Sequence, residues 1–378
     1  MRVLHLGKFY PPARGGMETI LALICDRTSA DVENTVLVAN DTCALSEERH
    51  GSVEVIRLPA IAKVGAVALL PTLPFRLRKA RTDLVIIHEP NPMALLAYFL
   101  ARPAGKLIVW FHSEVIRPSW RYALFYRPFL RFAFARASRI IVASPTLAAS
   151  APQLRGWQSK CLVIPYGLEI TQGDVSPRVA ARADAIRQEA AGRPLVLFVG
   201  RLVKYKGVDV LLEAMRGVSA TAMLVGNGPE RAALQQIADR EGVTDRVTFL
   251  GEVDPDELAA LYRACDVFVL PSVTRQEAFG VVQIEAMACG KPVISTDLGT
   301  GSGWVNQDGE TGFVVPPRDV RALHDALVRL LADDTLQKRM GAASRQRARA
   351  MFGADRMAAS VLALYHEVTG DRAGGRAA

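Results

Sequence analysis

Short apolar segments alternate with helical patterns along nearly the whole chain, and this alternation limits the folds that the chain can adopt. Each segment is rich in Val, Ile and Leu and is apolar throughout, which predicts parallel strands buried on both faces. Helical patterns lie between several of these segments, as in βα units. The predicted strands cover residues 3–6, 35–39, 53–58, 84–88, 107–111, 140–143, 162–165, 195–199, 222–225, 247–253, 267–270, 293–296 and 313–315.

The repeated βα order predicts an α/β protein built from two doubly wound, Rossmann-like domains. A polar stretch at residues 171–192 separates two series of strands, and we interpret it as a linker with a lead-in helix. With 378 residues, the chain is long enough for two domains with separate cores. We therefore expect a first domain at 1–170, a second at 171–352, a last helix at 353–369 and a disordered tail at 370–378.

The cysteine and apolar content favours a soluble, cytoplasmic protein. Five scattered cysteines without a C-x-x-C pair argue for a reducing compartment, and against a disulfide framework or a zinc site. The first residues form a strand pattern and not a signal peptide. The longest uncharged apolar runs, 64–75 and 90–101, contain proline and are too short to span a bilayer.

Positive charge is concentrated in the first half of the chain. Residues 1–168 contain 21 Lys and Arg against 11 Asp and Glu, a net charge of +10. Residues 169–378 contain 25 against 27, a net charge of −2, so the two halves sum to +8. Such a surplus suits nucleic acid, an anionic membrane surface or an anionic acceptor substrate.

Residues 117–139 form a basic and aromatic stretch without an acidic residue. Arginines and aromatic side chains at helical spacing suit a helix that lies on an anionic bilayer, and 74–81 adds a second basic cluster. The alternative is a core-packed helix with solvated arginines, and Pro128 would kink or break the helix. A nucleic-acid binder is less favoured, because the stretch contains no recognised motif.

Two carboxylates follow the predicted strand 267–270. Glu277 lies in the loop after this strand, Gly280 lies where the next helix begins, and Glu285 lies about one turn inside that helix. The start of a helix offers free N–H groups to a phosphate. Carboxylates on both sides of a diphosphate suit the hydroxyl groups of a ribose and a hexose. The arrangement therefore indicates a nucleotide sugar as ligand.

Two cations follow the predicted strand 195–199. Arg201 comes directly after Gly200, and Lys206 precedes Gly207. A departing nucleoside diphosphate gains negative charge in the transition state, and fixed cations lower that barrier. We therefore expect Arg201 and Lys206 to bind a diphosphate, whereas Lys204 is expected to be solvated.

Further polar residues lie at the predicted strand ends of the first domain. His112 follows the strand 107–111, where ligands bind in doubly wound sheets. His88 and Glu89 end the preceding strand, and they could contact an acceptor or only pack behind the site. Gly15 and Gly16 precede a helical pattern, where the backbone can approach a ligand or simply turn.

We expect no metal ion in the site. Asp254-Pro255-Asp256 resembles a metal-binding Asp-x-Asp only superficially. We interpret Asp254 and Glu257 as a capping box that opens a helix at 255–264. Arg201 and Lys206 already supply the positive charge that a metal would bring.

These motifs together resemble the retaining GT-B glycosyltransferases of family 4. Glu277 and Glu285, with the flanks Pro271-Ser272 and Gly290–Ile294, are similar to the family's Glu-(seven residues)-Glu signature. Gly15-Gly16-Met17-Glu18 resembles its Gly-Gly-x-Glu loop, and Gly226–Pro229 resembles its G-x-G-P loop beside the nucleotide. The resemblance covers nearly the whole chain.

The resemblance implies a fold, an activity and a set of site residues. It implies two domains facing a cleft, a last helix that crosses back to the N-terminal domain, and metal-independent transfer without a protein nucleophile. The N-terminal domain would bind the acceptor and the C-terminal domain the nucleotide sugar. Implied catalytic residues are His112 near the anomeric carbon, Glu277 on the hexose, and Arg201 and Lys206 on the diphosphate; implied substrate contacts also include Gly15, Gly16, Glu18, Gly226, Val253, Ala278, Phe279, Gly280 and Glu285, the last on the ribose.

The glycine-rich loop 297–304 resembles that of members that transfer mannose or rhamnose from GDP-sugars. The loop could contact the base side of the donor or simply turn the chain, and its resemblance favours GDP-mannose as donor. From the resemblance as a whole we expect no bound cofactor and a lipid-linked or glycan acceptor. The basic stretch at 117–139 favours peripheral association with the inner face of the membrane. Three alternatives stay open: a UDP-sugar-dependent transferase, a nucleotide-sugar epimerase on the same fold, and a binding protein without catalytic activity.

Overall fold

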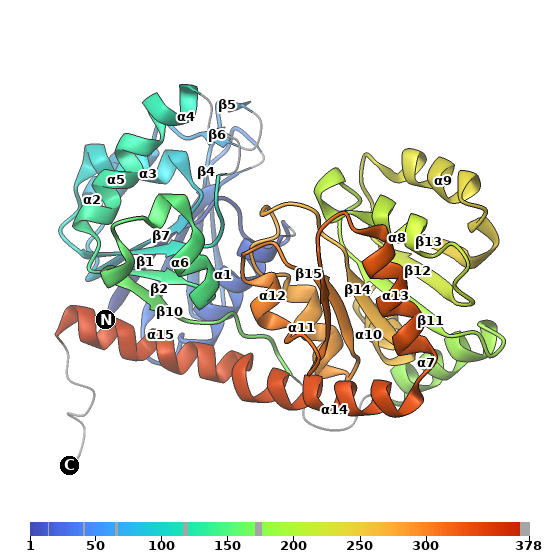
Figure 1. The fold of residues 1–378 in the computed structure, drawn as a ribbon. Helices are drawn as coiled ribbons and strands as arrows, with labels where there is room; N and C mark the ends of the chain where they lie inside the picture. The colour runs from blue at the N-terminus through green and yellow to red at the C-terminus, as the bar shows by residue number, and fades with distance from the viewer. Residues whose placement is uncertain (14, 41, 65–66, 116–119, 171–175, 371–378) are drawn as a thin grey trace, which may run out of the picture. The chain divides into compact units, whose positions relative to one another are not determined.

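The computed structural model describes residues 1–13, 15–40, 42–64, 67–115, 120–170 and 176–370. The chain divides into two compact units (Figure 1). Unit 1 consists of residues 1–167 together with the C-terminal residues from 354, and unit 2 consists of residues 168–353. The predicted tail from 371 onward, part of the predicted linker (171–175) and residues 117–119 of the basic stretch lie outside the described residues.

The core of unit 1 is an eight-stranded sheet in the order β10-β9-β8-β7-β1-β2-β4-β3. Every neighbouring pair is parallel except β3 and β4, which are antiparallel. A separate antiparallel pair is formed by β5 and β6. The strands are β1 (Arg2–Leu6), β2 (Glu33–Ala39), β3 (Ser46–His50), β4 (Val53–Leu58), β5 (Ala62–Val64), β6 (Val67–Leu69), β7 (Leu84–Glu89), β8 (Lys106–Phe111), β9 (Arg139–Val142) and β10 (Cys161–Val163).

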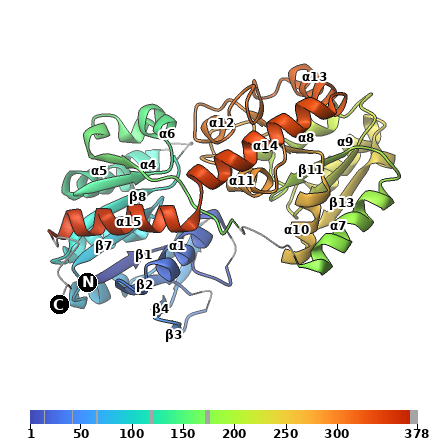
Figure 2. The same ribbon diagram turned by 90° about the horizontal axis from the view of Figure 1, so that it is seen from below.

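Helices cover both faces of this sheet (Figures 1 and 2). Buried residues of α2, α3 and α5 join one apolar cluster with alternate residues of the strands, and α1 and α15 contact each other. The helices of unit 1 are α1 (Gly16–Arg27), α2 (Leu73–Lys79), α3 (Pro92–Ala101), α4 (Trp120–Phe125), α5 (Arg127–Arg136), α6 (Pro145–Ser150) and α15 (Ala354–Thr369).

Unit 2 contains a six-stranded, fully parallel sheet in the order β13-β12-β11-β14-β15-β16. This is the order 3-2-1-4-5-6 of a doubly wound sheet, so the chain reverses direction across the sheet between β11 and β14. The strands are β11 (Leu195–Val199), β12 (Thr221–Val225), β13 (Val247–Gly251), β14 (Val267–Leu270), β15 (Val293–Thr296) and β16 (Gly312–Val315); the helices are α7 (Pro177–Glu189), α8 (Val208–Ala214), α9 (Arg231–Arg240), α10 (Pro255–Ala264), α11 (Val281–Ala288), α12 (Ser302–Val305), α13 (Val320–Leu331) and α14 (Asp334–Met351).

The predicted α/β, doubly wound fold is confirmed in both units, and the predicted bounds of α10 and α11 match the structure. The helix break that Pro128 predicts in the basic stretch is confirmed, since α4 ends at Phe125 and α5 begins with Pro128 in its first turn. One local prediction needs correction. The capping box of α10 is only half formed. Oδ1 of Asp254 accepts the N–H of Glu257, but the Glu257 carboxylate pairs with Arg182 instead of turning back.

Candidate functional site

The loops after β11 and β14 bring together two residues that the sequence assigned to different parts of a ligand. Nζ of Lys206 donates to Oε2 of Glu277 at 2.5 Å, and Oγ of Ser272 donates to the same oxygen at 2.9 Å. Lys206 is 9% exposed and Glu277 is 8% exposed. Burial acts to lower the pKa of Lys206, but the neighbouring Glu277 carboxylate outweighs it, so this pKa is raised. Lys206 is therefore a fixed cation at the switch point of the sheet.

Close packing of the two loops holds this pair in place. Gly207 has φ +66°, and a Cβ there would lie 2.1 Å from the carbonyl oxygen of Pro271. The N–H of Val273 also donates to the carbonyl of Tyr205 at 2.8 Å. A side chain at position 207 would push the two loops apart, so glycine is required by both conformation and space.

Arg201 also follows the carboxyl end of β11, but no described side chain fixes its position. Its side chain is exposed, and it has no hydrogen-bond or ion-pair partner among the residues that the structure describes. Its loop is fixed through the backbone, because the N–H of Leu202 donates to the carbonyl of Asn227. Gly226 has φ +121°, and a Cβ there would lie 2.2 Å from the carbonyl oxygen of Gly200. The guanidinium is thus free for a ligand on a rigid backbone.

The start of α11 is built from backbone contacts. Gly280 precedes the helix with φ +74°. The carbonyl of Ala278 accepts the N–H of Gly301, and the carbonyl of Glu277 accepts Oγ1 of Thr300. The Phe279 ring is buried against Trp304 and Phe352. The side chain of Phe279 therefore belongs to the core, and its carbonyl accepts Nε2 of Gln283 at 3.2 Å.

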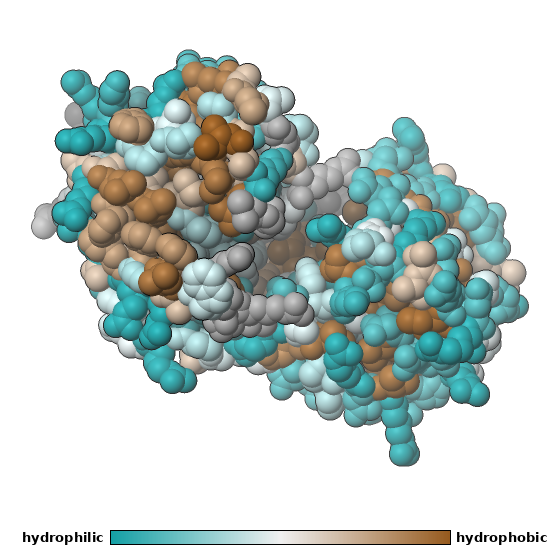
Figure 3. All heavy atoms as spheres, turned by 90° about the horizontal axis from the view of Figure 1, so that it is seen from above, coloured by the Kyte–Doolittle hydropathy of each residue, from teal (hydrophilic) through white to brown (hydrophobic). Residues whose placement is uncertain are grey.

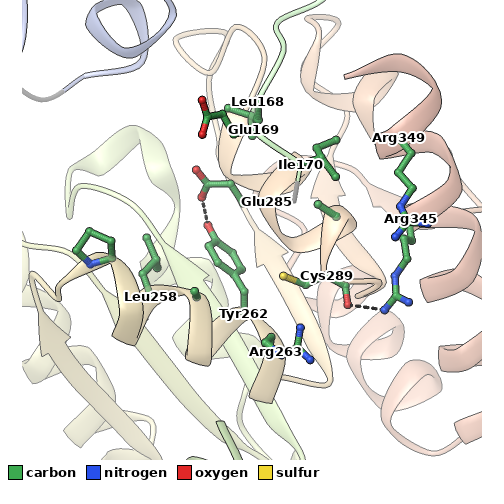
Figure 4. Close-up of a pocket in the computed structure, with 13 residues that line it drawn as sticks. Leu168, Glu169, Ile170, Leu258, Tyr262, Arg263, Glu285, Cys289, Arg345 and Arg349 are labelled. Carbon is green, nitrogen blue, oxygen red and sulfur yellow. Dashed lines mark hydrogen bonds between the residues drawn. The ribbon is translucent and has the colours of Figure 1, made fainter. Parts of the chain in front are cut away.

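Glu285 lies in a pocket of about 630 Å³ between α10, α11 and α14 (Figure 4). Oη of Tyr262 donates to Oε2 of Glu285 at 2.5 Å. Burial raises the pKa of the Glu285 carboxyl, and the Tyr262 hydrogen bond counteracts this effect. Figure 4 shows Glu285 and Glu169 near one end of the pocket and Arg263, Arg345 and Arg349 on its other sides. Val253, half-buried just beyond β13, precedes the first turn of α10.

The predicted glycine loop of unit 1 leads directly into α1. Gly15 precedes the helix with φ 173°, an extended conformation that any residue can adopt. A Cβ on Gly16 would meet nothing within 4 Å. Burial raises the pKa of the Glu18 carboxyl in the first turn, and Lys8 counteracts that shift. The open space at Gly16 is compatible with the predicted approach of a ligand, whereas a Cβ on Gly15 would lie 2.2 Å from Oε2 of Glu18.

His112 is buried at the end of β8, and both of its ring nitrogens are engaged. Nε2 lies 2.9 Å from Nδ1 of His88, and Nδ1 lies 2.7 Å from Oη of Tyr166. Burial lowers the pKa of His112 to about 3. The predicted contact with a sugar therefore requires that one of these two hydrogen bonds be exchanged.

His88 and Glu89, for which the sequence left two interpretations, are both buried behind the strand ends. His88 is bonded on both ring nitrogens, to His112 and to His5. Oε2 of Glu89 accepts Oη of Tyr126 at 2.5 Å and the N–H of Asn91 at 2.9 Å. Burial raises the pKa of Glu89 to about 7, and its Oε1 has no partner in the described part of the chain.

Two family models match this chain. Residues 181–347 match the model described as "Glycosyl transferases group 1", and residues 15–167 match "Glycosyl transferase 4-like domain". The chain is 33% identical over 374 residues to the O-antigen chain mannosyltransferase C of Escherichia coli, across 97% of this chain and 98% of that protein. The chain belongs to the family 4-type GT-B glycosyltransferases.

Other relatives of this glycosyltransferase agree with that membership. It is 34% identical over 364 residues to the D-rhamnosyltransferase WbpZ of Pseudomonas aeruginosa, across 94% of this chain and 93% of that protein. The solved sucrose-phosphate synthase of Thermosynechococcus elongatus has a TM-score of 0.81 and 26% identity, across 98% of this chain and 99% of that one. HepE of Anabaena, solved with UDP-glucose, has the same fold at a TM-score of 0.76 and 23% identity, across 97% and 100% of the two chains. The GT-B expectation is therefore confirmed.

Several residues that complete the candidate site of this glycosyltransferase were not predicted. Ser272 was noted only as a flank of the Glu277 motif, although its position at the end of an apolar strand could have indicated a role in the site. Tyr262 lies inside α10 and Tyr166 lies beyond β10, and neither carries a local signal. His5 lies within an apolar strand, where its neighbours in sequence give no hint of its two partners.

Within the described ranges, no three His, Cys, Asp or Glu side chains are grouped so that they could hold a metal ion. Asp256 instead pairs with Arg178 at 3.7 Å. None of the described helices combines the length and apolar character that crossing a bilayer requires.

Proposed function

We propose that this glycosyltransferase moves a hexose, with mannose or rhamnose favoured, from a nucleotide sugar to a lipid-linked or glycan acceptor. GDP is the favoured nucleotide, and the anomeric configuration is retained. The observation that carries the proposal is the placement of Lys206, Glu277 and the exposed Arg201 at the switch point of unit 2, where doubly wound sheets bind ligands. The named mannosyl and rhamnosyl relatives support the choice of sugar.

In this proposal, unit 2 binds the donor. Arg201 and Lys206 neutralise the diphosphate, Glu285 accepts hydrogen bonds from the ribose hydroxyls, and Glu277 accepts them from the hexose. Lys206 keeps its charge because Glu277 raises its pKa. Glu277 cannot approach a sugar as a free carboxylate, since one oxygen already accepts Lys206 and Ser272. It therefore positions the hexose and does not form a covalent bond.

The reaction then has a simple balance. The bond between the anomeric carbon and the phosphate oxygen breaks, and the acceptor oxygen bonds to the same face of that carbon. The acceptor proton passes to the departing diphosphate, whose negative charge Arg201 and Lys206 stabilise. Unit 1 binds the acceptor, and His112 and the Gly15-Gly16 loop contribute there. The two cations supply the charge that a metal ion provides in other transferases, so the proposed reaction is metal-independent.

A thermal-shift panel tests the donor. GDP-mannose, GDP, UDP-glucose, UDP-N-acetylglucosamine and UDP are added without metal, and stabilisation reports binding to the folded state. We expect selective stabilisation by the two GDP compounds, and its loss in Arg201→Ala. Selective stabilisation by the UDP compounds would overturn the donor assignment while keeping the mechanism. An epimerised sugar formed without acceptor would favour the isomerase alternative.

We also propose that unit 1 docks on an anionic membrane surface. Apolar residues gather on the face of unit 1 that Figure 3 shows, over the helices α2 to α5. Trp120, Leu124 and Phe125 of α4 are 67%, 60% and 61% exposed, and Phe75 of α2 is 71% exposed. Arg131 and Arg136 of α5 are exposed nearby in sequence, whereas Arg139 pairs with Glu367 of α15. Exposed aromatic side chains beside arginines suit the interface of an anionic bilayer.

A further inference from the structure

Three buried histidines of unit 1 form one continuous hydrogen-bonded chain. Nε2 of His5 lies 3.2 Å from Oδ1 of Asn34, and Nδ1 of His5 lies 3.1 Å from Nε2 of His88. Nδ1 of His88 lies 2.9 Å from Nε2 of His112, whose Nδ1 lies 2.7 Å from Oη of Tyr166. This chain of hydrogen bonds crosses four neighbouring strands of the sheet, in the order β2, β1, β7 and β8.

The direction of every hydrogen bond in this chain follows from its buried end at Asn34. Oγ1 of Thr28 donates to the carbonyl of Ile24 at 2.7 Å, so its only proton is used. It must therefore accept from Nδ2 of Asn34, which lies 3.0 Å away and also donates to the carbonyl of Cys25 at 3.0 Å. These two bonds fix the orientation of the amide, so Oδ1 of Asn34 faces His5.

An amide oxygen can only accept, so Nε2 of His5 carries the proton. A neutral imidazole has one protonated nitrogen, so Nδ1 of His5 accepts from Nε2 of His88. The same step repeats at His88 and leaves His112 with a protonated Nε2 and an unprotonated Nδ1. Oη of Tyr166 then donates to Nδ1 of His112. One amide thus decides the tautomer of a ring three hydrogen bonds away.

Burial keeps all three rings neutral. Burial lowers the pKa of His5 to about 4 and that of His112 to about 3, and lowers the pKa of His88 well below its usual value. Trp110 stacks against both His88 and His112, with ring centroids 5.4 and 5.5 Å apart, which restricts rotation of the two rings. The chain of hydrogen bonds does not transmit protons, because Oδ1 of Asn34 at its end is too weak a base to accept one.

We propose that Asn34, His5 and His88 are positioning residues that hold His112 in a single neutral tautomer, whose Nδ1 accepts a hydrogen bond from a sugar hydroxyl in place of Tyr166. This inference rests on the proposed glycosyl transfer. It assigns a direction to the contact: Nδ1 of His112 accepts a hydrogen bond from a hydroxyl group and does not donate one. A hydroxyl can replace the Tyr166 hydroxyl without any change in the protonation of the ring.

The tautomers can be read directly from ¹⁵N spectra of the full chain with ¹⁵N-labelled histidine. Protonated and unprotonated ring nitrogens differ in chemical shift, and variants that lack His50, His324 or His366 assign the remaining signals. We expect a protonated Nε2 and an unprotonated Nδ1 for His5, His88 and His112 between about pH 6 and 8. A protonated Nδ1 on any of the three would overturn the inference, and this result does not depend on which sugar is transferred.

Two matched variants test the role of Asn34. Asn34→Leu removes the amide oxygen that accepts from His5, so the chain loses its preferred direction and a protonated Nδ1 should appear on His112. Thr28→Val removes one hydrogen bond at the same place but leaves Asn34 bonded to the carbonyl of Cys25, so His112 should keep its tautomer. If Asn34→Leu does not fold, the wild-type spectrum still decides the tautomers. An unchanged His112 in folded Asn34→Leu would contradict the role of Asn34.

Enzyme kinetics test whether the tautomer of His112 affects the rate of sugar transfer. We expect Asn34→Leu to lose roughly tenfold in kcat, the size of one hydrogen bond, and Thr28→Val to retain most of it. Adding the donor identified by thermal shift should move the His112 Nδ1 signal while Nε2 stays protonated. A protein that transfers sugar without moving this signal would overturn the assignment. Absence of any transfer would overturn the proposed function instead, and the spectra of the free protein would stand.

Discussion

Lys206 and Glu277, which are 71 positions apart in the sequence, form a buried ion pair with 2.5 Å between Nζ and Oε2. Removing one partner of such a pair leaves a buried, uncompensated charge, which costs about 3–5 kcal/mol. We expect Glu277→Gln to lower the free energy of unfolding by about this amount, measured by denaturant unfolding. The double variant Lys206→Met/Glu277→Gln should recover part of the loss.

The exposed pair of Arg321 and Asp325, at 3.9 Å on α13, provides the control. Asp325→Asn should leave stability nearly unchanged, because exposed pairs contribute little. Equal losses in Glu277→Gln and Asp325→Asn would contradict a structural role for the buried pair.

Arg201→Ala should separate catalysis from stability. The Arg201 side chain is exposed and has no partner among the described residues, so its removal should leave the melting temperature unchanged. If its charge stabilises the departing diphosphate, turnover should fall roughly 10²-fold or more. Lys204→Ala, on the same loop and also exposed, should retain turnover. Similar turnover in the two variants would remove Arg201 from the mechanism.

Tyr262→Phe should make donor binding more sensitive to pH. The Tyr262 hydroxyl donates to Glu285 and counteracts the burial that raises the pKa of this carboxyl. Without it, more Glu285 is protonated at a given pH, and a protonated carboxyl accepts ribose hydroxyls less well. We expect affinity for the nucleotide, measured by calorimetry, to fall at acidic pH and to recover as pH rises. A loss of affinity that is equal at all pH values would indicate a packing effect only.

The buried histidines should make stability fall in acid. The pKa of His5 is lowered from 6.5 to about 4 and that of His112 from 6.5 to about 3. Between pH 6.5 and these lowered values, the unfolded chain therefore binds more protons than the folded one. Their contribution is therefore fully present above about pH 6.5 and is lost as pH falls toward about 3. The melting temperature should therefore increase as the pH is raised from 5 to 6.5.

Glu89 opposes this trend, which Glu89→Gln tests. The pKa of Glu89 is raised from 4.5 to about 7, so the folded state binds more protons and loses stability as pH rises through this range. Glu89→Gln should show a steeper rise between pH 5 and 7, with up to about 3 kcal/mol gained relative to wild type. The exposed Glu47→Gln is the control. Parallel pH profiles for Glu89→Gln and wild type would disprove the assignment.

Membrane docking should depend on the exposed side chains of α4. We expect the protein to co-sediment with anionic vesicles at low salt and to be released as salt rises. Replacing both Trp120 and Phe125 by Ser should weaken sedimentation strongly. Val328→Ser, which removes an exposed apolar side chain from α13 of unit 2, should not. Absence of sedimentation at low salt would end this proposal.

The sequence alone was enough to predict the elements whose burial is complete or whose ends are marked locally. The strands β14 and β15 and the helices α10 and α11 match the predicted bounds, because an uninterrupted apolar run indicates a buried parallel strand and a proline or glycine marks a helix start. The edge strand β3, by contrast, was missed. It reads Ser-Glu-Glu-Arg-His and is largely exposed, so it has no apolar pattern.

Only the tertiary structure decided which polar groups meet. Strand order and register place Lys206 on Glu277, and they join His5, His88 and His112 into one chain although these residues lie 83 and 24 positions apart. For the same reason, the Glu257 carboxylate pairs with Arg182 instead of capping its own helix. Local sequence determines which backbone conformation each segment favours. The partner of a buried charge or ring depends on which strands become neighbours, and this is a property of the whole sheet.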